Sequence, residues 1–275
     1  MRARILRRAA RKFVQLASSM DGIVAHRRIR ASARMKSLGH YFAAQILRKP
    51  RRHCPVCGFW LTEFLPFGAV PRKSAKCSNC GALERHRLVW LYFQRRTDLF
   101  NGKEKKVLNV APEACFDKRL RKMLRGVYIT ADLNHPRAIL KMDICAIPYP
   151  EQTFDVFYCS HVLEYVPNDR QALAEIFRVL KPGAWAVILF SVTANKTIED
   201  PTVVDPVKRC VLYGDERFRK YGLDCIDRVR EAGFKVTVIG VRDLVREDEA
   251  VRMGLTPASG EVVFCSKPRD HQRIF

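Results

Sequence analysis

The stretch Val107-Leu108-Asn109-Val110-Ala111-Pro112-Glu113 decides the fold, because an apolar run ends at a proline and a helical pattern follows. The run predicts a buried strand, and the apolar spacing that begins at Phe116 predicts a helix. A second strand, 127–131, ends on Asp132, about twenty residues past the first turn, where an acidic side chain can accept hydrogen bonds from ribose hydroxyls. This order is typical of a nucleotide-binding α/β unit.

The alternation of strands and helices continues along the chain. Residues 153–159 form another apolar run, which leads into Ser160-His161. A helix begins at Asn168-Asp169, which are good N-cap residues, and stops at Lys181-Pro182-Gly183, before an apolar strand over 185–190. Such a pattern predicts a mainly parallel sheet covered on both faces, with ligands over the carboxyl ends of its strands. Later elements are predicted at 225–232, 235–241 and 261–266.

These motifs resemble those of the class I S-adenosylmethionine-dependent methyltransferases, in particular the type 11 subgroup. The resemblance covers residues 84–275 and is carried by Asp132, Met142-Asp143-Ile144, Phe154-Asp155-Val156, Ser160-His161-Val162-Leu163-Glu164 and Arg178-Val179-Leu180-Lys181-Pro182-Gly183. It implies a doubly wound α/β fold with a mostly parallel seven-stranded sheet and S-adenosyl-L-methionine as cofactor. It also implies that Asp132 binds the ribose and Asp143 the adenine amino group, while Ser160-His161 borders the methyl side of the cofactor.

The first turn departs from the family pattern, which usually has an acidic residue followed by a glycine-rich G-x-G. No glycine lies between Asn109 and Glu113, although glycines there let the backbone approach the ligand. Ala111 is small, and Glu113 can reach the methionine end of the cofactor. A non-catalytic binding module with this fold stays open as an alternative. The expected cofactor-binding residues are Asn109, Ala111, Glu113, Asp132, Asp143, Ile144 and Ser160.

Two cysteine motifs, Cys54-Pro55-Val56-Cys57-Gly58 and Cys77-Ser78-Asn79-Cys80-Gly81, predict a metal site. Each C-x-x-C turn points two thiolates one way, so two turns complete a tetrahedral four-sulfur shell. Four protein ligands leave no open position, and we therefore expect a structural Zn²⁺ on Cys54, Cys57, Cys77 and Cys80. Iron in a rubredoxin-like centre and two disulfides are the alternatives. The six other cysteines are scattered, as expected for a reducing compartment.

The net charge of +22 is concentrated near the N-terminus. Residues 1–53 contain fifteen Arg and Lys and one acid, Asp21, and apolar residues are interleaved with them, which predicts amphipathic helices. Such an arm can bind an anionic membrane surface, bind RNA or DNA phosphates, or pack on the protein. Its apolar runs are too short for a transmembrane helix and lack signal-peptide features. We expect a cytoplasmic protein, with the arm as a hypothetical peripheral membrane contact.

The expected domains are a basic arm (1–53), a zinc ribbon (54–83) and a methyltransferase domain (84–275). A helix after the second cysteine motif joins the last two, and its polar Glu84-Arg85-His86-Arg87 cluster is interpreted as a solvated helix face. Residues 191–215 show no helical or strand periodicity and are interpreted as an insertion. The resemblance to the methyltransferase family implies that the acceptor pocket is built at this position.

The predicted reaction is methyl transfer from S-adenosylmethionine to an oxygen or nitrogen of an unidentified acceptor. His161 is the first candidate for a general base, because imidazole titrates near neutral pH. Glu164 is the second candidate, and a carboxylate that merely faces solvent is the other interpretation of it. An RNA methyltransferase that holds RNA with its ribbon and arm is an alternative function.

Overall fold

The computed structural model describes residues 51–269. These residues fall into two compact units. The first contains the described residues 51–52 and 60–63, and within it the N–H of Arg51 donates to the carbonyl oxygen of Leu61 at 3.1 Å. The second unit contains all other described residues, including both cysteine motifs.

Most of the expected basic arm, residues 1–50, lies outside the described residues. The membrane, nucleic-acid and packing interpretations of the arm therefore stay predictions. Within residues 51–269, no helix combines the length and the apolar character needed to cross a membrane.

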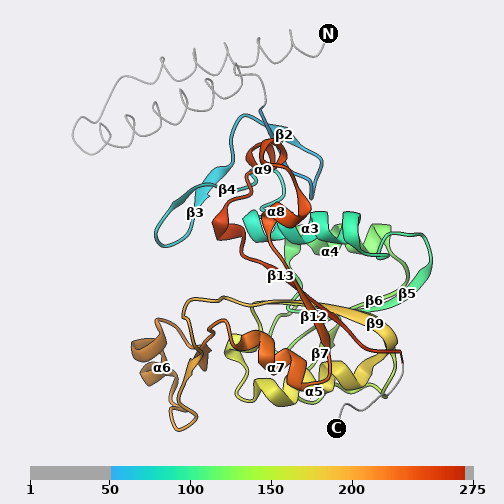
Figure 1. Cartoon of the computed structure of the whole chain (residues 1–275), viewed down its shortest axis with the longest axis vertical. Helices are drawn as coiled ribbons and strands as arrows, with labels where there is room; N and C mark the ends of the chain where they lie inside the picture. The colour runs from blue at the N-terminus through green and yellow to red at the C-terminus, as the bar shows by residue number, and fades with distance from the viewer. Residues whose placement is uncertain (1–50, 270–275) are drawn as a thin grey trace, which may run out of the picture. The chain divides into compact units, whose positions relative to one another are not determined.

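A seven-stranded sheet forms the centre of the second unit, in the order β12-β13-β9-β8-β5-β6-β7 (Figure 1). Its strands are β5 (Glu104–Val110), β6 (Arg125–Asp132), β7 (Leu140–Lys141), β8 (Phe154–Ser160), β9 (Leu180–Leu189), β12 (Lys235–Ile239) and β13 (Val262–Ser266). Neighbouring strands from β9 to β7 are parallel, whereas β13 is antiparallel to both β9 and β12. This architecture confirms the predicted doubly wound, mostly parallel sheet.

The central strand β5 fixes where a ligand would lie. Asn109 on β5 is opposite Thr130 on β6 and Tyr158 on β8, and Ser160 at the end of β8 is opposite Leu189 on β9. Because these strands are parallel, their carboxyl ends meet at one edge of the sheet. We call this edge the carboxyl edge.

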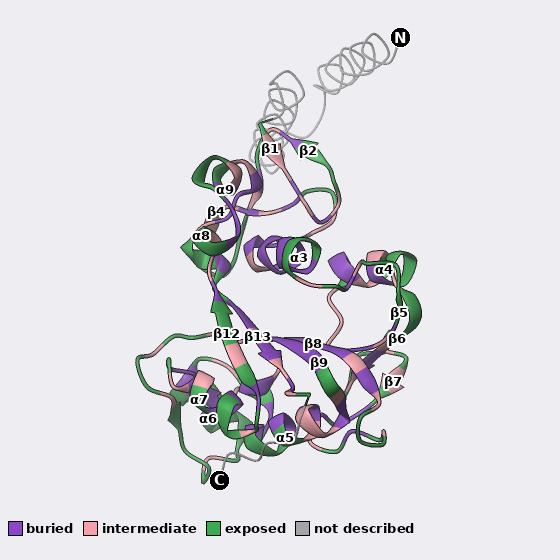
Figure 2. Ribbon diagram, turned by 45° about the vertical axis from the view of Figure 1, so that its right-hand side comes forward, coloured by how far each residue is buried: buried purple, intermediate pink, exposed green. Residues whose placement is uncertain are grey.

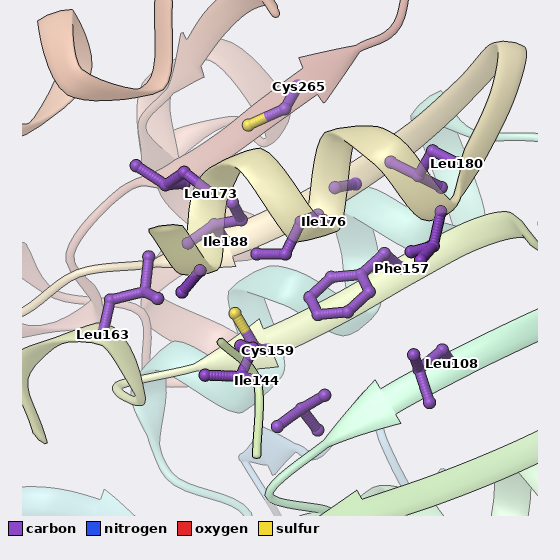
Figure 3. Close-up of a cluster of buried hydrophobic side chains, with 14 of the residues drawn as sticks. Leu108, Ile144, Phe157, Cys159, Leu163, Leu173, Ile176, Leu180, Ile188 and Cys265 are labelled. Atoms are coloured by element: carbon purple, nitrogen blue, oxygen red, sulfur yellow. The ribbon is translucent and has the colours of Figure 1, made fainter. Parts of the chain in front are cut away.

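Helices α5 (Asp169–Val179) and α7 (Cys225–Glu231) pack on one face of the sheet. The α5 helix begins as predicted, since the side chain of Asn168 accepts a hydrogen bond from the N–H of Gln171 at 3.0 Å. Its apolar side chains join buried strand residues in one core cluster (Figure 3). The residues labelled there are Leu108, Ile144, Phe157, Cys159, Leu163, Leu173, Ile176, Leu180, Ile188 and Cys265.

Helices α3 (Glu84–Arg96) and α4 (Ala114–Met123) cover the opposite face, and α3 is mostly buried (Figure 2). Aromatic rings fill this layer: the centroids of Phe93 and Tyr158 are 5.5 Å apart, as are those of Trp90 and Phe116. The sheet is thus covered on both faces, as its continuous apolar strands predict.

The insertion after β9 contains a helix that periodicity did not reveal, α6 (Pro206–Tyr213). The side chain of Asp205 caps it by accepting the N–H of Lys208 at 2.9 Å, and Gly214 ends it in the left-handed conformation. The Asp-Pro start and the Gly stop are local signals in the sequence. Its exposed side chains Val207, Cys210 and Val211 follow helical spacing, but eight residues are too short a stretch for this period to predict a helix.

The remaining elements are short. They are β1 (Arg52–His53), β2 (Trp60–Leu61), β3 (Leu65–Phe67), β4 (Arg72–Lys76), β10 (Ile198–Glu199), β11 (Arg219–Lys220), α8 (Val241–Leu244), α9 (Glu247–Met253) and the 3-10 helices η1 (Leu163–Tyr165) and η2 (Pro257–Ser259). Strands β3 and β4 form an antiparallel pair beside the cysteine motifs, and β10 in the insertion pairs with β11, which follows the insertion.

Candidate functional site

The four predicted metal ligands form one cluster. The Sγ atoms of Cys54, Cys57, Cys77 and Cys80 lie within 4.8 Å of one another, and the Cys54–Cys80 and Cys57–Cys77 pairs are each 3.8 Å apart. A tetrahedral ion with four thiolate ligands at ~2.3 Å separates its sulfurs by about 3.8 Å, so this donor set fits such an ion. All ten cysteines are free thiols, which contradicts the two-disulfide alternative.

The two cysteine turns share one backbone geometry. The N–H of Gly58 donates to the carbonyl oxygen of Cys54 at 2.8 Å, and the N–H of Gly81 donates to that of Cys77 at 2.9 Å. Both glycines are left-handed, with φ of 69° and 76°. A side chain with a Cβ adopts this conformation only at a cost, which explains the glycine after each C-x-x-C.

The first turn of the carboxyl edge keeps a left-handed bend although it lacks glycine. Ala111 has φ of 55°, and its N–H donates to the carbonyl oxygen of Ala131 at 2.8 Å. An alanine in this conformation costs about 1–3 kcal/mol, which the surrounding strands must offset. The backbone therefore bends here much as a glycine would allow.

Replacement of Ala111 by glycine is expected to raise the free energy of unfolding by ~0.5–1 kcal/mol, because relief of the strained φ exceeds the extra freedom of the unfolded chain. Ala111→Val should lower it, since a β-branched residue tolerates a positive φ even less than alanine. Urea unfolding at a constant m-value measures both changes. A glycine variant less stable than the natural protein would show that the turn is not strained.

Glu113 follows this turn and is largely buried. Its Oε2 accepts a hydrogen bond from the Tyr158 hydroxyl at 2.6 Å, and its Oε1 lies 2.9 Å from Nε2 of His86. Burial raises the pKa of Glu113, but the adjacent His86 ring and the Tyr158 hydroxyl outweigh it, so the pKa lies below its usual value. The carboxyl edge thus carries an ionised carboxylate at neutral pH.

A second carboxylate lies where β6 ends. Oδ1 of Asp132 accepts the backbone N–H groups of Asn134 and His135 at 2.8 and 2.7 Å. The N–H of Met142 donates to the carbonyl oxygen of Asp132 at 3.1 Å, which brings the Asp143 loop beside this strand end. The predicted ribose and adenine ligands therefore come from neighbouring turns of the carboxyl edge.

Asp143 and Ile144 face different surroundings. Asp143 is exposed, and its Oδ1 accepts the N–H of Cys145 at 2.8 Å. Ile144 is buried and its side chain belongs to the core cluster (Figure 3). Only the backbone of Ile144 is thus left to contribute to a ligand site.

Four buried polar atoms near the carboxyl edge have no hydrogen-bond partner among the residues that the structure describes. They are Oδ1 of Asn109, Oε1 of Glu113, Oγ of Ser160 and Oε2 of Glu164. Buried polar groups are almost always paired with protein, water or ligand. Atoms of this kind at the ends of β5 and β8 fit an edge that binds a polar molecule such as a nucleoside with an amino-acid tail.

His161 and Glu164 come together just beyond β8. His161 has a left-handed φ of 53°, an uncommon strained conformation, and its Nδ1 lies 3.6 Å from Oε1 of Glu164. Glu164 is only 1% exposed, and its Oε1 accepts the N–H of Ser191 at 2.6 Å. The interpretation of Glu164 as a solvent-facing carboxylate is therefore wrong. The Glu164 carboxylate thus connects η1, which follows β8, to Ser191 at the start of the insertion.

Ion pairs that the sequence did not reveal attach the insertion to the sheet helices. Glu199 accepts from Arg219 at 2.8 Å and from Arg228 at 2.6 Å. Arg228 also donates to Asp169 at 2.9 Å, and the Tyr221 hydroxyl donates to the same carboxylate at 2.6 Å. Residues from β10, β11, α5 and α7 meet in this network, so no local pattern could have predicted it.

Acidification is expected to loosen the insertion. Burial alone raises the pKa of Glu199, but Arg228 and Arg219 outweigh it and lower the pKa to about 2. A carboxyl whose folded pKa is depressed stabilises fully above its unfolded pKa, near 4.5, and loses this contribution as the pH falls toward 2. The hydrogen-exchange protection factors of residues 191–224, which correct for the intrinsic exchange rate at each pH, should fall as the pH is lowered across this window. Glu199→Gln should show low protection factors already at pH 6. Equal exchange in both proteins at pH 6 would rule this role out.

The polar start of α3 differs from its interpretation as a solvated face. Glu84, His86 and Arg87 are 2%, 6% and 0% exposed. Arg87 donates to the carbonyl oxygens of Ala75 and Ala82, and Glu84 forms a bidentate pair with Arg72. The solvated-face prediction is wrong, because these polar groups are buried by tertiary contacts with the segment 54–82 that carries both cysteine motifs. We call this segment the cysteine unit.

Comparison with known proteins finds that one segment of this fold matches a protein family. Residues 107–188, which run from β5 to β9, match the model of a family described as "Methyltransferase domain". The ubiquinone/menaquinone biosynthesis C-methyltransferase UbiE of Pasteurella multocida is 35% identical over 81 residues, which are 30% of this chain and 28% of that protein. The sterol 24-C-methyltransferase erg6 of Schizosaccharomyces pombe is 25% identical over 154 residues, which are 54% of this chain and 39% of that protein.

A solved S-adenosylmethionine dependent methyltransferase from Mesorhizobium loti has a TM-score of 0.46 and 13% identity, covering 65% of this chain and 97% of that chain. The present chain spans less than half the length of the two curated relatives. The sheet order and the matched segment together identify the described domain as one with the class I S-adenosylmethionine-dependent methyltransferase fold.

Proposed function

We propose that this chain is an S-adenosylmethionine-dependent methyltransferase that acts on an oxygen or nitrogen nucleophile. One observation carries the proposal: the carboxyl edge gathers two acidic strand ends and four buried polar atoms without hydrogen-bond partners. The family match of residues 107–188 supports the same function.

The described residues offer polar groups that would bind each part of the cofactor. Asp132 accepts hydrogen bonds from the ribose and Asp143 from the adenine amino group, while Asn109, Glu113 and Ser160 serve the methionine end. Bound S-adenosylmethionine supplies an activated methyl group on a positively charged sulfur. The chain's own part is to align the acceptor and to exclude water.

His161 is the proposed general base. It lies at the end of β8, is 31% exposed, and places Nδ1 beside the buried Glu164. Nε2 would take the proton of the acceptor, while Nδ1 lies 3.6 Å from the Glu164 carboxylate. Its strained backbone is consistent with a functional position.

The insertion is the proposed acceptor site, and it exposes apolar side chains. Val204, Val207 and Val211 are 72%, 72% and 82% exposed. The relative from Pasteurella multocida is named a ubiquinone/menaquinone biosynthesis C-methyltransferase, and the one from Schizosaccharomyces pombe a sterol 24-C-methyltransferase. A carbon nucleophile on an apolar acceptor is therefore the second candidate.

We also propose that the four-cysteine cluster holds a structural Zn²⁺. Its sulfur separations fit a tetrahedral ion, and four protein ligands leave no position for catalysis. An iron centre would fit the same separations but would be coloured, so metal analysis with an absorption spectrum distinguishes the two metals.

Methyl transfer itself can be tested without knowing the acceptor. The full chain would be incubated with cofactor carrying a radiolabelled methyl group and with separate lipid, RNA and protein fractions. We expect label in an organic-soluble product, and mass spectrometry of that product identifies the methylated atom as oxygen, nitrogen or carbon. Label in RNA instead would favour the RNA methyltransferase, and no label in any fraction would support the non-catalytic module.

A further inference from the structure

Helix α3 begins directly after the second cysteine turn, and its third residue faces back onto that turn. The N–H of Leu83 donates to Nδ1 of His86 at 3.0 Å. A ring nitrogen that accepts a hydrogen bond carries no hydrogen, so the ring hydrogen is assigned to Nε2. The backbone that leaves the cysteine unit thus sets the tautomer and orientation of His86.

The other side of the same ring faces the first turn of the carboxyl edge. Nε2 of His86 lies 2.9 Å from Oε1 of Glu113, and Oε2 of Glu113 accepts from the Tyr158 hydroxyl at 2.6 Å. His86 and Tyr158 are 6% and 2% exposed. Glu113 is therefore held from two sides, by α3 and by β8.

The start of α3 is in turn fixed by the cysteine unit. Arg87 is fully buried and donates to the carbonyl oxygens of Ala75 and Ala82, which flank the second cysteine turn, at 2.9 and 3.0 Å. Its guanidinium also stacks 3.9 Å from the centroid of the Phe64 ring. A cysteine unit of this size depends on its metal to keep its shape, so metal loss would release these anchors.

We propose that His86 is a positioning residue that couples the four-cysteine unit to cofactor binding by orienting Glu113. The inference rests on the proposed function, in which Glu113 serves the methionine end of the cofactor. It extends the cofactor site beyond the matched segment 107–188 to α3, a helix that contacts the cysteine unit through Arg87. Metal in the cluster then raises cofactor affinity although it lies outside the cofactor site.

The test measures binding of S-adenosylhomocysteine by calorimetry in metal-loaded protein. His86→Phe keeps the ring volume but loses the nitrogen that lies 2.9 Å from Oε1 of Glu113. We expect binding at least about tenfold weaker, because a polar contact with a charged carboxylate is lost. His86→Gln should stay within about threefold of the natural protein, since its amide N–H can donate to Glu113. This rescue would not follow if the imidazole only filled space.

Three controls separate coupling from general loosening. Tyr92→Phe alters another buried ring on α3, which packs on Phe264, and should leave affinity unchanged. Metal content of each variant, measured by mass spectrometry, should equal that of the natural protein. Tyr158→Phe removes the second hold on Glu113 but keeps the ring that packs on Phe93 of α3, so it should weaken binding and provides a test even if the His86 variants fold poorly.

Metal removal gives an independent arm. Chelated natural protein should bind S-adenosylhomocysteine about as weakly as metal-loaded His86→Phe, and chelated His86→Phe should be no weaker, because both changes break one connection. If the reductions in affinity caused by chelation and by His86→Phe multiply in the combined case, the coupling is refuted. Equal binding by the natural protein and His86→Phe would also refute it, and neither result would affect the proposed function. No binding by the natural protein would overturn the proposed function and the coupling together.

Discussion

Replacing Cys57 or Cys80 by serine should lower metal affinity at least about 100-fold, because loss of a residue that only supports a ligand already costs about 10–100-fold. The unit around residues 54–82 has little apolar core of its own, so most of its folding energy comes from the metal. We expect its amides to lose hydrogen-exchange protection in the variants, and the start of α3 with them.

Cys210→Ser is the matched control, since Cys210 is an exposed free thiol outside the cluster. This variant should keep one metal ion per chain and full protection of residues 54–82. Natural protein that purifies without zinc, or with iron and its colour, would contradict the zinc assignment. Retention of zinc by both cluster variants would contradict the four-ligand site.

Replacing Asp132 by alanine is the second large expected effect. Loss of a charged acceptor for the ribose hydroxyls should weaken cofactor binding by about 1.5–3 kcal/mol, or roughly 10- to 150-fold. The same change also removes the acceptor of the Asn134 and His135 N–H groups. A variant that keeps this turn is therefore required.

Asp132→Asn supplies it, because an amide oxygen can still accept both backbone N–H groups while the charge is lost. We expect its affinity for S-adenosylhomocysteine to fall as well, although less than in the alanine variant. Asp155→Ala is the negative control, since Asp155 pairs with Lys181 near the opposite end of β8 and should not affect binding. Unchanged affinity in both Asp132 variants would disprove the ribose assignment.

Much of this fold could be predicted because its signals are local. Continuous apolar strands, the Asn168 cap and two glycine-ended cysteine turns each specify their own backbone, and the structure has all of them. The helix α6 escaped prediction because its eight residues are too few to establish the helical period of its exposed apolar side chains, and its caps are the clearer signal.

The site was less predictable, because its remaining parts depend on contacts between distant residues. Glu164 is buried and accepts a hydrogen bond from the N–H of Ser191, which lies just after β9 and is distant from Glu164 in the sequence. The role of His86 depends on Glu113, which is distant in sequence and adjacent only once α3 packs on the sheet. The consecutive polar residues 84–87 predict a solvated helix face, and only the tertiary structure shows that Glu84, His86 and Arg87 are buried.

Calorimetric titration of the metal-loaded full chain with S-adenosylhomocysteine tests the central claim most directly. The proposed function predicts saturable binding with one site per chain, and binding that is weakened at least about tenfold in Asp132→Ala. Absence of binding heat at several temperatures, in protein whose fold is confirmed by circular dichroism, would contradict the claim that this carboxyl edge is a cofactor site.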